Sequence, residues 1–119
     1  QPLFLYPADW LSANHDRLLI EEAHALEHFP EKQNVLARIG ALSAFDIDAR
    51  LGEIDTPTLV IASRDDLLVP YTQSRHLAEA LPNARLEMFD YGGHGLTVTV
   101  PAAFNASVER FLTIRSPLR

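Results

Sequence analysis

The chain has 119 residues, a formal net charge of −6 and no cysteine. The negative charge and the lack of a Lys/Arg cluster argue against a nucleic-acid-binding groove, and the missing thiols exclude disulfides, thiolate metal sites and a cysteine nucleophile. The composition, 47% hydrophobic and 22% charged, is typical of one globular domain.

Targeting signals are not recognisable in the sequence. No apolar run is long enough to cross a membrane, and no positively charged start leads into an apolar signal core. We therefore expect no membrane association and, by default, a cytoplasmic location. The chain begins with Gln1 rather than Met, which indicates either a fragment of a longer protein or a processed terminus.

Residues 1–55 are predicted to be mainly helical. The first seven residues contain two prolines among large apolar side chains, and we expect an extended, packed segment there because proline disfavours helix in the residue before it. Apolar residues recur at helical spacing over residues 16–29, and Pro30 ends or restarts that helix. A second amphipathic stripe covers residues 35–42, and a short capped turn ends near Leu51.

The hydrophobic period changes at residue 58. Residues 58–62 form a short, β-rich, apolar run, typical of a parallel strand buried on both faces. A helix then ends at Pro82, an alternating strand covers residues 85–90, and a last helix starts at Pro101. This order predicts a right-handed crossover between two parallel strands.

Two further expectations concern the last helix and the sheet. In the last helix, the side chains expected to face inward are Phe104, Val108, Phe111 and Leu112. Two parallel strands are too few to be stable by themselves, so we expect the sheet to continue in residues outside this sequence.

Two polar groups follow the two predicted strands. Asp66 follows the first strand, and His94 follows the second inside a turn that contains Gly92, Gly93 and Gly95. Because the carboxyl ends of parallel strands meet at one edge of a sheet, we expect the two side chains to lie together. A carboxylate that accepts the Nδ1 proton of a histidine leaves Nε2 as a general base. The bland alternative is an ordinary glycine turn that carries a surface histidine.

The stretches IDTPTLVIASRDDLLVP and LEMFDYGGHG resemble the C-terminal part of the α/β-hydrolase family. That family places its acid after one strand, a few residues before a proline, and its histidine in a glycine-rich loop after the next strand. The resemblance implies that Asp66, which precedes Pro70, is the triad acid and that His94 is the general base and acid.

The resemblance extends to the first half of the chain. It implies an α/β fold in which residues 1–45 are helices of a cap, residues 46–57 a linker, and residues 58–119 the C-terminal part of the catalytic domain. The stretches QPLFLYPADW and NVLARIGALSAFD resemble hydrolases of pyrimidine utilisation. This implies hydrolysis of a C–N bond in a small molecule, aminoacrylate or carbamate, without metal or cofactor. Hydrolysis of an ester, a lactone or a C–C bond is the alternative.

The family's nucleophile elbow, G-x-S-x-G, does not occur in these 119 residues. The resemblance therefore implies that the serine and the oxyanion hole lie outside the chain and that the chain by itself is inactive. We expect a missing N-terminal half or a second copy to complete the sheet, and hence a homo-oligomer. An alternative of another class is a non-catalytic interaction piece that associates through its open strand edge.

Three residues are candidates for substrate binding, since ligand pockets are mostly apolar. They are Trp10, Leu67 and Tyr91, and simple packing is the alternative for each. Asp66 could instead cap the following helix, and we interpret its neighbour Asp65 as a turn or supporting residue.

A pair of histidines raises the possibility of a zinc site. His24 and His28 lie four residues apart on one predicted helix face. The metalloprotease pattern needs Glu directly after the first His, however, and Ala25 stands there. With no third ligand apparent, we expect no metal.

Overall fold

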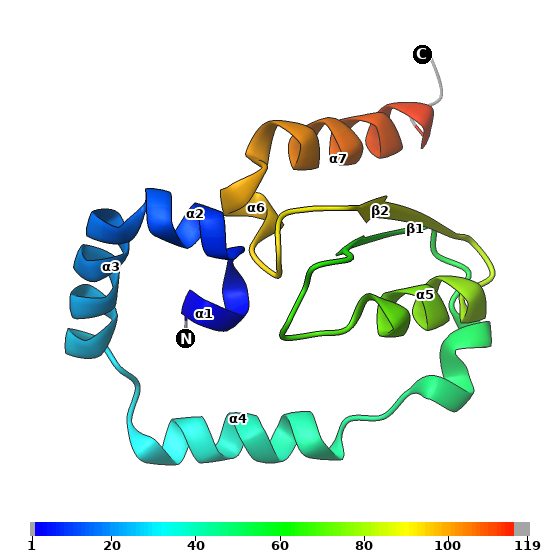
Figure 1. Ribbon diagram of the computed structural model, residues 1–119. Helices are drawn as coiled ribbons and strands as arrows, with labels where there is room; N and C mark the ends of the chain where they lie inside the picture. The colour runs from blue at the N-terminus through cyan, green and yellow to red at the C-terminus, as the bar shows by residue number, and fades with distance from the viewer. Residues whose placement is uncertain (1, 116–119) are drawn as a thin grey trace.

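The computed structural model describes residues 2–115 (Figure 1). Four helices come first and form an open arc, and a small α/β unit follows. In chain order the elements are α1 (Pro2–Leu5), α2 (Ala8–Ala13), α3 (His15–Glu27), α4 (Lys32–Ala44), the 3₁₀ helix η1 (Asp48–Glu53), β1 (Thr58–Ser63), α5 (Tyr71–Ala80), β2 (Ala84–Phe89), α6 (Leu96–Thr99) and α7 (Pro101–Arg115).

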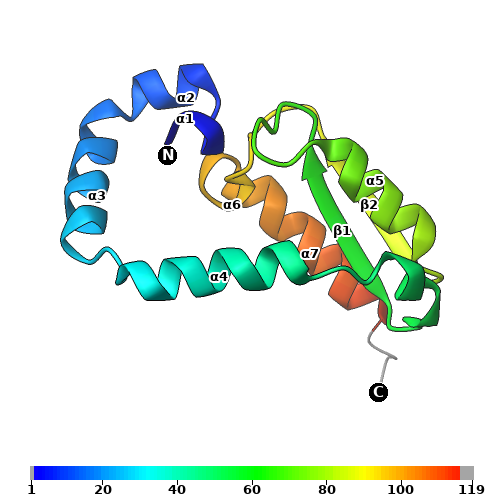
Figure 2. The ribbon, with the colours of Figure 1, turned by 90° about the horizontal axis from the view of Figure 1, so that it is seen from below.

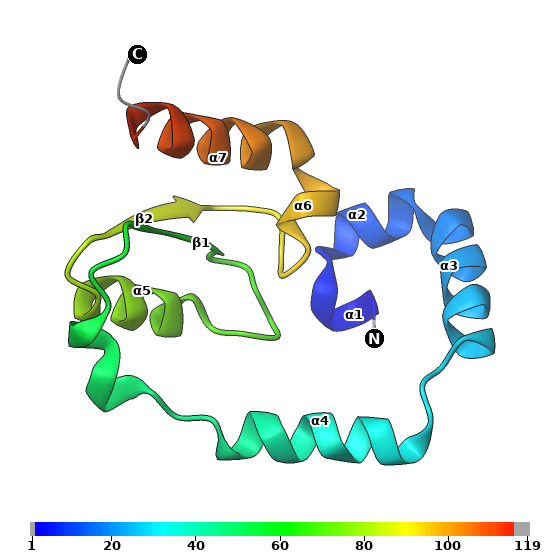
Figure 3. The same ribbon diagram turned by 180° about the vertical axis from the view of Figure 1, so that it is seen from behind.

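The predicted strand–helix–strand unit is present. Within the described residues, β1 pairs with β2 in a parallel two-stranded sheet whose register runs from Thr58 opposite Ala84 to Ser63 opposite Phe89. Helix α5 makes the crossover and packs against both strands. Figures 1 and 3 show α5 on one side of the sheet and α7 on the other. Because the strands are parallel and in register, the loops that follow them leave the same edge of the sheet.

The hydrophobic core lies between the sheet, α5 and η1. Its buried members are Leu51, Val60 and Leu81, and the half-buried Leu77 and Leu86 pack against them. The apolar run of β1 was expected to be buried on both faces, but Leu59 and Ile61 are only half-buried. The described residues therefore cover β1 less completely than a central parallel strand requires.

Two local expectations are wrong at the start and end of the chain. Residues Pro2 to Leu5 form a helical turn, closed by the bond from Tyr6 N to the Pro2 carbonyl, rather than an extended segment. Proline suits the first position of a helix because its missing N–H has no intrahelical partner there. In α7, Leu112 was expected to face inward, yet it is 60% exposed.

The helices of the first half expose most of their apolar side chains. Helix α3 buries Leu18 among its stripe, whereas Leu19 and Leu26 are exposed, and α4 contributes no buried residue. The helix was expected to extend to Phe29, but α3 ends at Glu27, and Phe29 lies beyond it and is exposed. Figures 1 and 2 together show why: α4 spans the distance between α3 and the α/β unit, and Figure 1 shows no element of the described chain packed along it. The amphipathic pattern therefore predicted the helices correctly, but the described residues do not bury most of their apolar side chains.

Candidate active site

The tips of β1 and β2 bring the predicted acid and histidine together. Asp66 Oδ2 and His94 Nδ1 are 2.9 Å apart, although the residues are 28 positions apart in the chain. The Asp66 side chain is 11% exposed and the His94 side chain 39% exposed. A carboxylate accepts at this distance from an Nδ1–H tautomer, and that tautomer leaves Nε2 with its lone pair.

The Asp66 carboxylate is oriented by its own loop. Its Oδ1 accepts hydrogen bonds from the backbone N–H groups of Leu68 at 2.8 Å and Val69 at 2.9 Å. Helix α5 begins later, after Pro70, with no side-chain cap. The alternative in which Asp66 caps the following helix therefore does not describe this loop. One oxygen anchors the carboxylate to the backbone and the other faces the histidine ring.

The glycines of the histidine turn serve two different needs. Gly92 and Gly93 have φ values of 136° and 64°, which side-chain-bearing residues rarely adopt. Gly95 has an ordinary φ, but a Cβ there would lie 2.5 Å from the Tyr6 ring. Its N–H donates to the Leu5 carbonyl at 2.9 Å. The turn is thus sharp and also closely covered by the N-terminal segment.

Asp65, interpreted from sequence as a turn or supporting residue, contacts the same turn. Its carboxylate accepts hydrogen bonds from the N–H groups of Gly92 at 3.1 Å and Gly93 at 2.9 Å, and from the hydroxyl of Ser63. Burial acts to raise the pKa of the Asp65 carboxyl, but the hydrogen bonds outweigh it and the pKa is lowered. The adjacent Asp-Asp pair after β1 and the adjacent Gly-Gly pair after β2 are the sequence signal from which this contact could have been predicted.

A cavity of about 450 Å³ lies beside the histidine turn. Leu67 and Tyr91, two of the expected substrate-binding residues, line it together with Asp65, Gly93 and apolar residues of α1 and α2. Leu67 is 72% exposed. Asp66 and His94 are not among the lining residues, so the cavity adjoins the pair rather than containing it.

Trp10, the third expected substrate-binding residue, lies away from this lining. Its ring packs at 4.6 Å from the Tyr6 ring, and the Arg17 guanidinium lies 5.8 Å from its centre. Tyr6 itself lines the cavity. Trp10 therefore contacts a residue of the cavity wall, Tyr6, without lining the cavity itself.

Tyr91 links the histidine turn to α2, a contact that the sequence did not suggest. Its hydroxyl donates to Asp9 Oδ1 at 2.9 Å. Burial, and after it the bond to Asp9, raises the pKa of the Tyr91 phenol. The phenol therefore stays protonated and able to donate at neutral pH.

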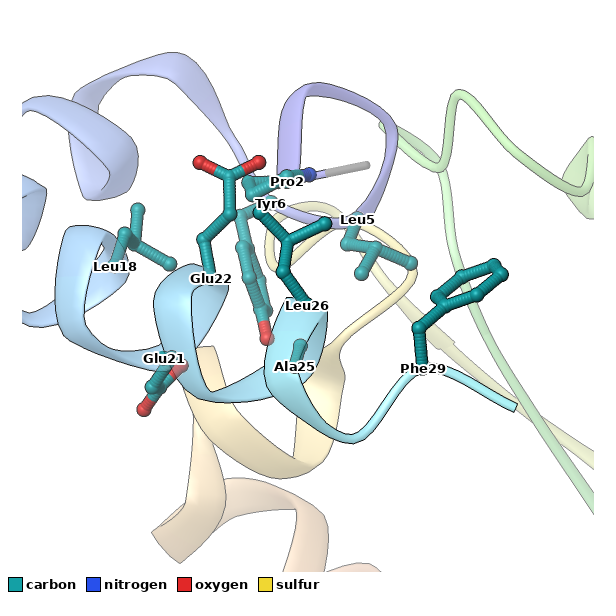
Figure 4. A pocket seen from close by; sticks show the side chains of 9 residues that line it. All are labelled: Pro2, Leu5, Tyr6, Leu18, Glu21, Glu22, Ala25, Leu26 and Phe29. Atoms are coloured by element: carbon teal, nitrogen blue, oxygen red, sulfur yellow. The ribbon is translucent and has the colours of Figure 1, made fainter. Parts of the chain in front are cut away.

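A second hollow, of about 270 Å³, lies between α1 and α3 (Figure 4). Its lining is mostly apolar, with the carboxylates of Glu21 and Glu22 at its edge. Neither Asp66 nor His94 lines it. Its position away from the paired side chains makes it a poor candidate for the reaction site.

His24 of α3 and His28, which follows the last residue of that helix, do not form a metal centre with other described residues. The rings of His24 and His28 stack with their centres 4.3 Å apart. Among residues 2–115 no group of three or more His, Cys, Asp and Glu side chains is arranged to hold a metal ion. His76, a further histidine of the chain, pairs with Asp48 across α5 and η1.

A comparison with protein families decides the class. The model of a family described as TAP-like protein, a group of α/β-hydrolases, matches residues 42–116. The chain belongs to the TAP-like α/β-hydrolases. The match spans the α/β unit and includes both Asp66 and His94, so the expected family and fold class are confirmed.

Curated relatives of this hydrolase chain bear the name carbamate hydrolase RutD. The protein of Pseudomonas savastanoi pv. phaseolicola is 57% identical over 116 residues, which are 98% of this chain and 45% of that protein. The protein of Rhizobium rhizogenes is 57% identical over 119 residues, 100% of this chain and 45% of that protein. The chain thus spans less than half the length of these relatives.

Solved structures agree on the fold. An α/β-hydrolase from a Medee basin deep-sea metagenome library superposes with a TM-score of 0.79 at 26% identity, covering 99% of this chain and 43% of that one. The enol-lactonase of Burkholderia xenovorans LB400 superposes with a TM-score of 0.80 at 26% identity, covering 94% and 42%. Between residues 2 and 115, this chain has no helix whose length and apolarity suit a membrane crossing.

Proposed function

We propose that this chain supplies the acid and the base of a serine-type α/β-hydrolase whose nucleophile lies outside the 119 residues. The observation that carries the proposal is the 2.9 Å contact between Asp66 Oδ2 and His94 Nδ1 at the tips of adjacent parallel strands. The half-exposed ring presents Nε2 to a group on another part of the enzyme. This arrangement is two-thirds of a nucleophile–base–acid relay.

The proposed reaction runs in two halves. His94 Nε2 takes the proton of a serine hydroxyl as the serine oxygen attacks the electrophilic carbon of the substrate, and Asp66 stabilises the imidazolium that forms. His94 then gives this proton to the leaving nitrogen, so the C–N bond breaks and an amine or ammonia departs. In the second half, His94 takes a proton from water as the water oxygen bonds to the same carbon. The bond between that carbon and the serine oxygen then breaks, His94 returns the proton to the serine oxygen, and the product leaves.

We propose a small C–N compound, carbamate or aminoacrylate, as the substrate. The RutD relatives support this choice, because their name refers to carbamate hydrolysis and they match nearly the whole chain at 57% identity. Leu67 and Tyr91 would form one wall of the binding site, since both line the cavity beside the histidine turn. Trp10 would support that wall through its contact with Tyr6.

Lactone or ester hydrolysis is the second candidate. The similarity to an enol-lactonase, with a TM-score of 0.80 over 94% of this chain, favours it. The cavity beside the histidine turn is also lined largely by apolar side chains, among them Leu3, Phe4 and Leu11, which suit a larger and less polar substrate.

We further propose that an N-terminal part of the enzyme covers the apolar faces left open here and continues the sheet. The exposed Leu36, Ile39 and Leu42 of α4 support this, as does the coverage of only 45% of the relatives' length. On this proposal, residues 1–45 belong to a cap, residues 46–57 link it to the catalytic part, and the intact enzyme is cytoplasmic. The last four residues of the expected 58–119 portion lie outside the described residues.

A chimera tests the function. In it, this chain replaces the segment with which it aligns in the Pseudomonas savastanoi relative. We expect the chimera to release ammonia from carbamate or aminoacrylate, and the 119-residue chain by itself to release none. Enol-lactone and simple ester substrates, assayed in parallel, separate the second candidate from the first. A folded chimera that hydrolyses none of these substrates would overturn the proposal, and activity of the isolated chain would overturn the placement of the nucleophile.

A further inference from the structure

Asp65 lies beside the proposed triad acid, yet its contacts go to the backbone of the histidine turn. Its Oδ2 accepts from Gly92 N at 3.1 Å, and its Oδ1 accepts from Gly93 N at 2.9 Å and from the Ser63 hydroxyl. Ser63 is only 1% exposed, so packing fixes the hydroxyl that donates to the Asp65 carboxylate.

The histidine turn needs an anchor because of its composition. Gly92 and Gly93 both have positive φ, and glycine has the largest conformational freedom to lose on folding. Successive backbone N–H groups in such a turn form a concave site that suits an anion. The Asp65 carboxylate occupies that site, and hydrogen bonds to an ionised acceptor are stronger than neutral ones.

Asp65 connects the histidine turn to the loop after β1, which also carries Asp66. Other bonds hold the turn elsewhere: Thr99 Oγ1 donates to the Gly92 carbonyl at 2.7 Å, and Gly95 N to the Leu5 carbonyl at 2.9 Å. Those partners lie in α6 and in the N-terminal segment. Asp65 instead ties the turn to the loop of β1, immediately before Asp66 in the chain.

We propose that Asp65 is a positioning residue that locks the Gly92–Gly93 turn onto the β1 tip, so that the His94 ring meets Asp66. The inference rests on the proposed function, since positioning matters for catalysis only if His94 is the base. The two neighbouring carboxylates then have separate tasks: Asp65 holds the backbone of the turn and Asp66 holds the ring.

The test compares Asp65→Asn with Asp90→Asn in the chimera. Asn keeps the shape of the side chain but puts an NH₂ group where a backbone N–H needs an acceptor. We expect kcat to fall about 10- to 100-fold, because a displacement of about 1 Å in a catalytic group has that effect, while KM stays within about threefold. Asp90 is the matched control, as it stands at the end of β2 and pairs on the surface with Arg64 at 2.9 Å. Its variant should keep the wild-type kcat.

A spectroscopic measurement tests the inference without activity. In the folded chimera, the Nδ1 proton of His94 bonded to Asp66 should give a downfield proton resonance, and Gly92 and Gly93 should give protected backbone amides. Asp65→Asn should abolish the downfield resonance and remove the protection of the two glycine amides. Asp90→Asn should preserve the resonance and the protection. An inactive wild-type chimera that still shows this pattern would reject the proposed function and support the positioning role of Asp65.

Two results would overturn the inference: a wild-type kcat in Asp65→Asn, or an unchanged His94 resonance in that variant. If Asp65→Asn does not fold, Ser63→Ala takes its place. It removes the hydroxyl donor to Asp65 and leaves both glycine contacts available. We expect a smaller loss of kcat at unchanged KM, and an unchanged kcat would again reject the inference.

Discussion

Gly95 donates its backbone N–H to the Leu5 carbonyl at 2.9 Å, so the start of the chain lies directly on the histidine turn. The contact joins residues 90 positions apart. A Cβ at Gly93 would also approach this segment, at 2.8 Å from the Leu5 oxygen and 3.1 Å from Pro7 Cδ. The N-terminal residues and the turn can therefore pack together only while the turn carries glycine.

Gly93→Ala should destabilise the protein. The substitution places a Cβ against backbone and also requires a left-handed conformation, which costs roughly 1–2 kcal/mol for a residue other than glycine. We expect the free energy of unfolding of the chimera, measured with urea, to fall by at least about 2 kcal/mol. Gly52→Ala is the matched control, because nothing lies within 4 Å of a Cβ placed there and Gly52 lies in η1, away from the α4 face that the proposed N-terminal part covers. It should change the free energy of unfolding by no more than about 0.5 kcal/mol, and equal effects of the two substitutions would contradict this account.

Asp66→Asn should impair catalysis much more than binding. The amide can keep the bonds from Leu68 and Val69 to its oxygen, but it cannot stabilise the His94 imidazolium as a carboxylate does. We expect kcat of the chimera to fall by about 10³- to 10⁴-fold with little change in KM. Steady-state kinetics on the preferred substrate decide this, and a near-normal kcat would remove Asp66 from the triad.

His94→Ala should lower kcat by a factor similar to that of Asp66→Asn, and the double variant of both residues should lower it little further. Groups that act as one unit give strongly non-additive effects, because the second substitution removes something that the first has already disabled. We therefore expect His94→Ala, with and without Asp66→Asn, to have rates within about tenfold of one another. Fully multiplicative losses would show that the two side chains act independently despite their 2.9 Å contact.

The lowered pKa of Asp65 predicts an acid dependence of stability. Because the pKa in the folded protein lies below its ordinary value of 3.8, the ionised carboxylate stabilises the fold above that value, and the contribution is lost as the pH falls through the folded-state pKa. The difference in unfolding free energy between wild type and Asp65→Asn should thus begin to narrow below about pH 5 and keep narrowing until the pH is below the folded-state pKa. Urea titrations of the chimera at each pH measure this difference. A difference that does not change with pH would show that ionisation of Asp65 does not contribute to stability.

The isolated chain should associate in solution. Its described residues expose large apolar side chains on α3 and α4 and leave an outer strand edge of the two-stranded sheet unpaired. Sedimentation should show dimers or larger species, by sheet continuation or domain swapping. Adding the N-terminal part of a curated relative should convert them to a one-to-one complex. A compact monomer that unfolds cooperatively would instead support a self-sufficient domain.

Local patterns predicted much of the α/β unit. The change from helical spacing to a β-rich run located β1, and the alternating pattern located β2. Proline signals placed the end of α5 and the start of α7 within a few residues. The same reasoning failed at Pro2–Leu5 because a proline can begin a helix as readily as it can prevent one. It also could not predict how much of each apolar stripe the fold buries, and Leu26 and Leu112 are exposed.

The sequence determined that an acid and a histidine follow two strands, and parallel pairing then required the same edge of the sheet for both. The chemistry of the two side chains could not determine which of the adjacent aspartates faces the ring, since Asp65 and Asp66 are the same residue type. Only the resemblance to the α/β-hydrolases favoured Asp66. The tertiary structure decided this: backbone N–H groups of the turn bind Asp65, and the ring binds Asp66. Those partners lie more than 25 residues away, and only the folded chain brings them within hydrogen-bond distance.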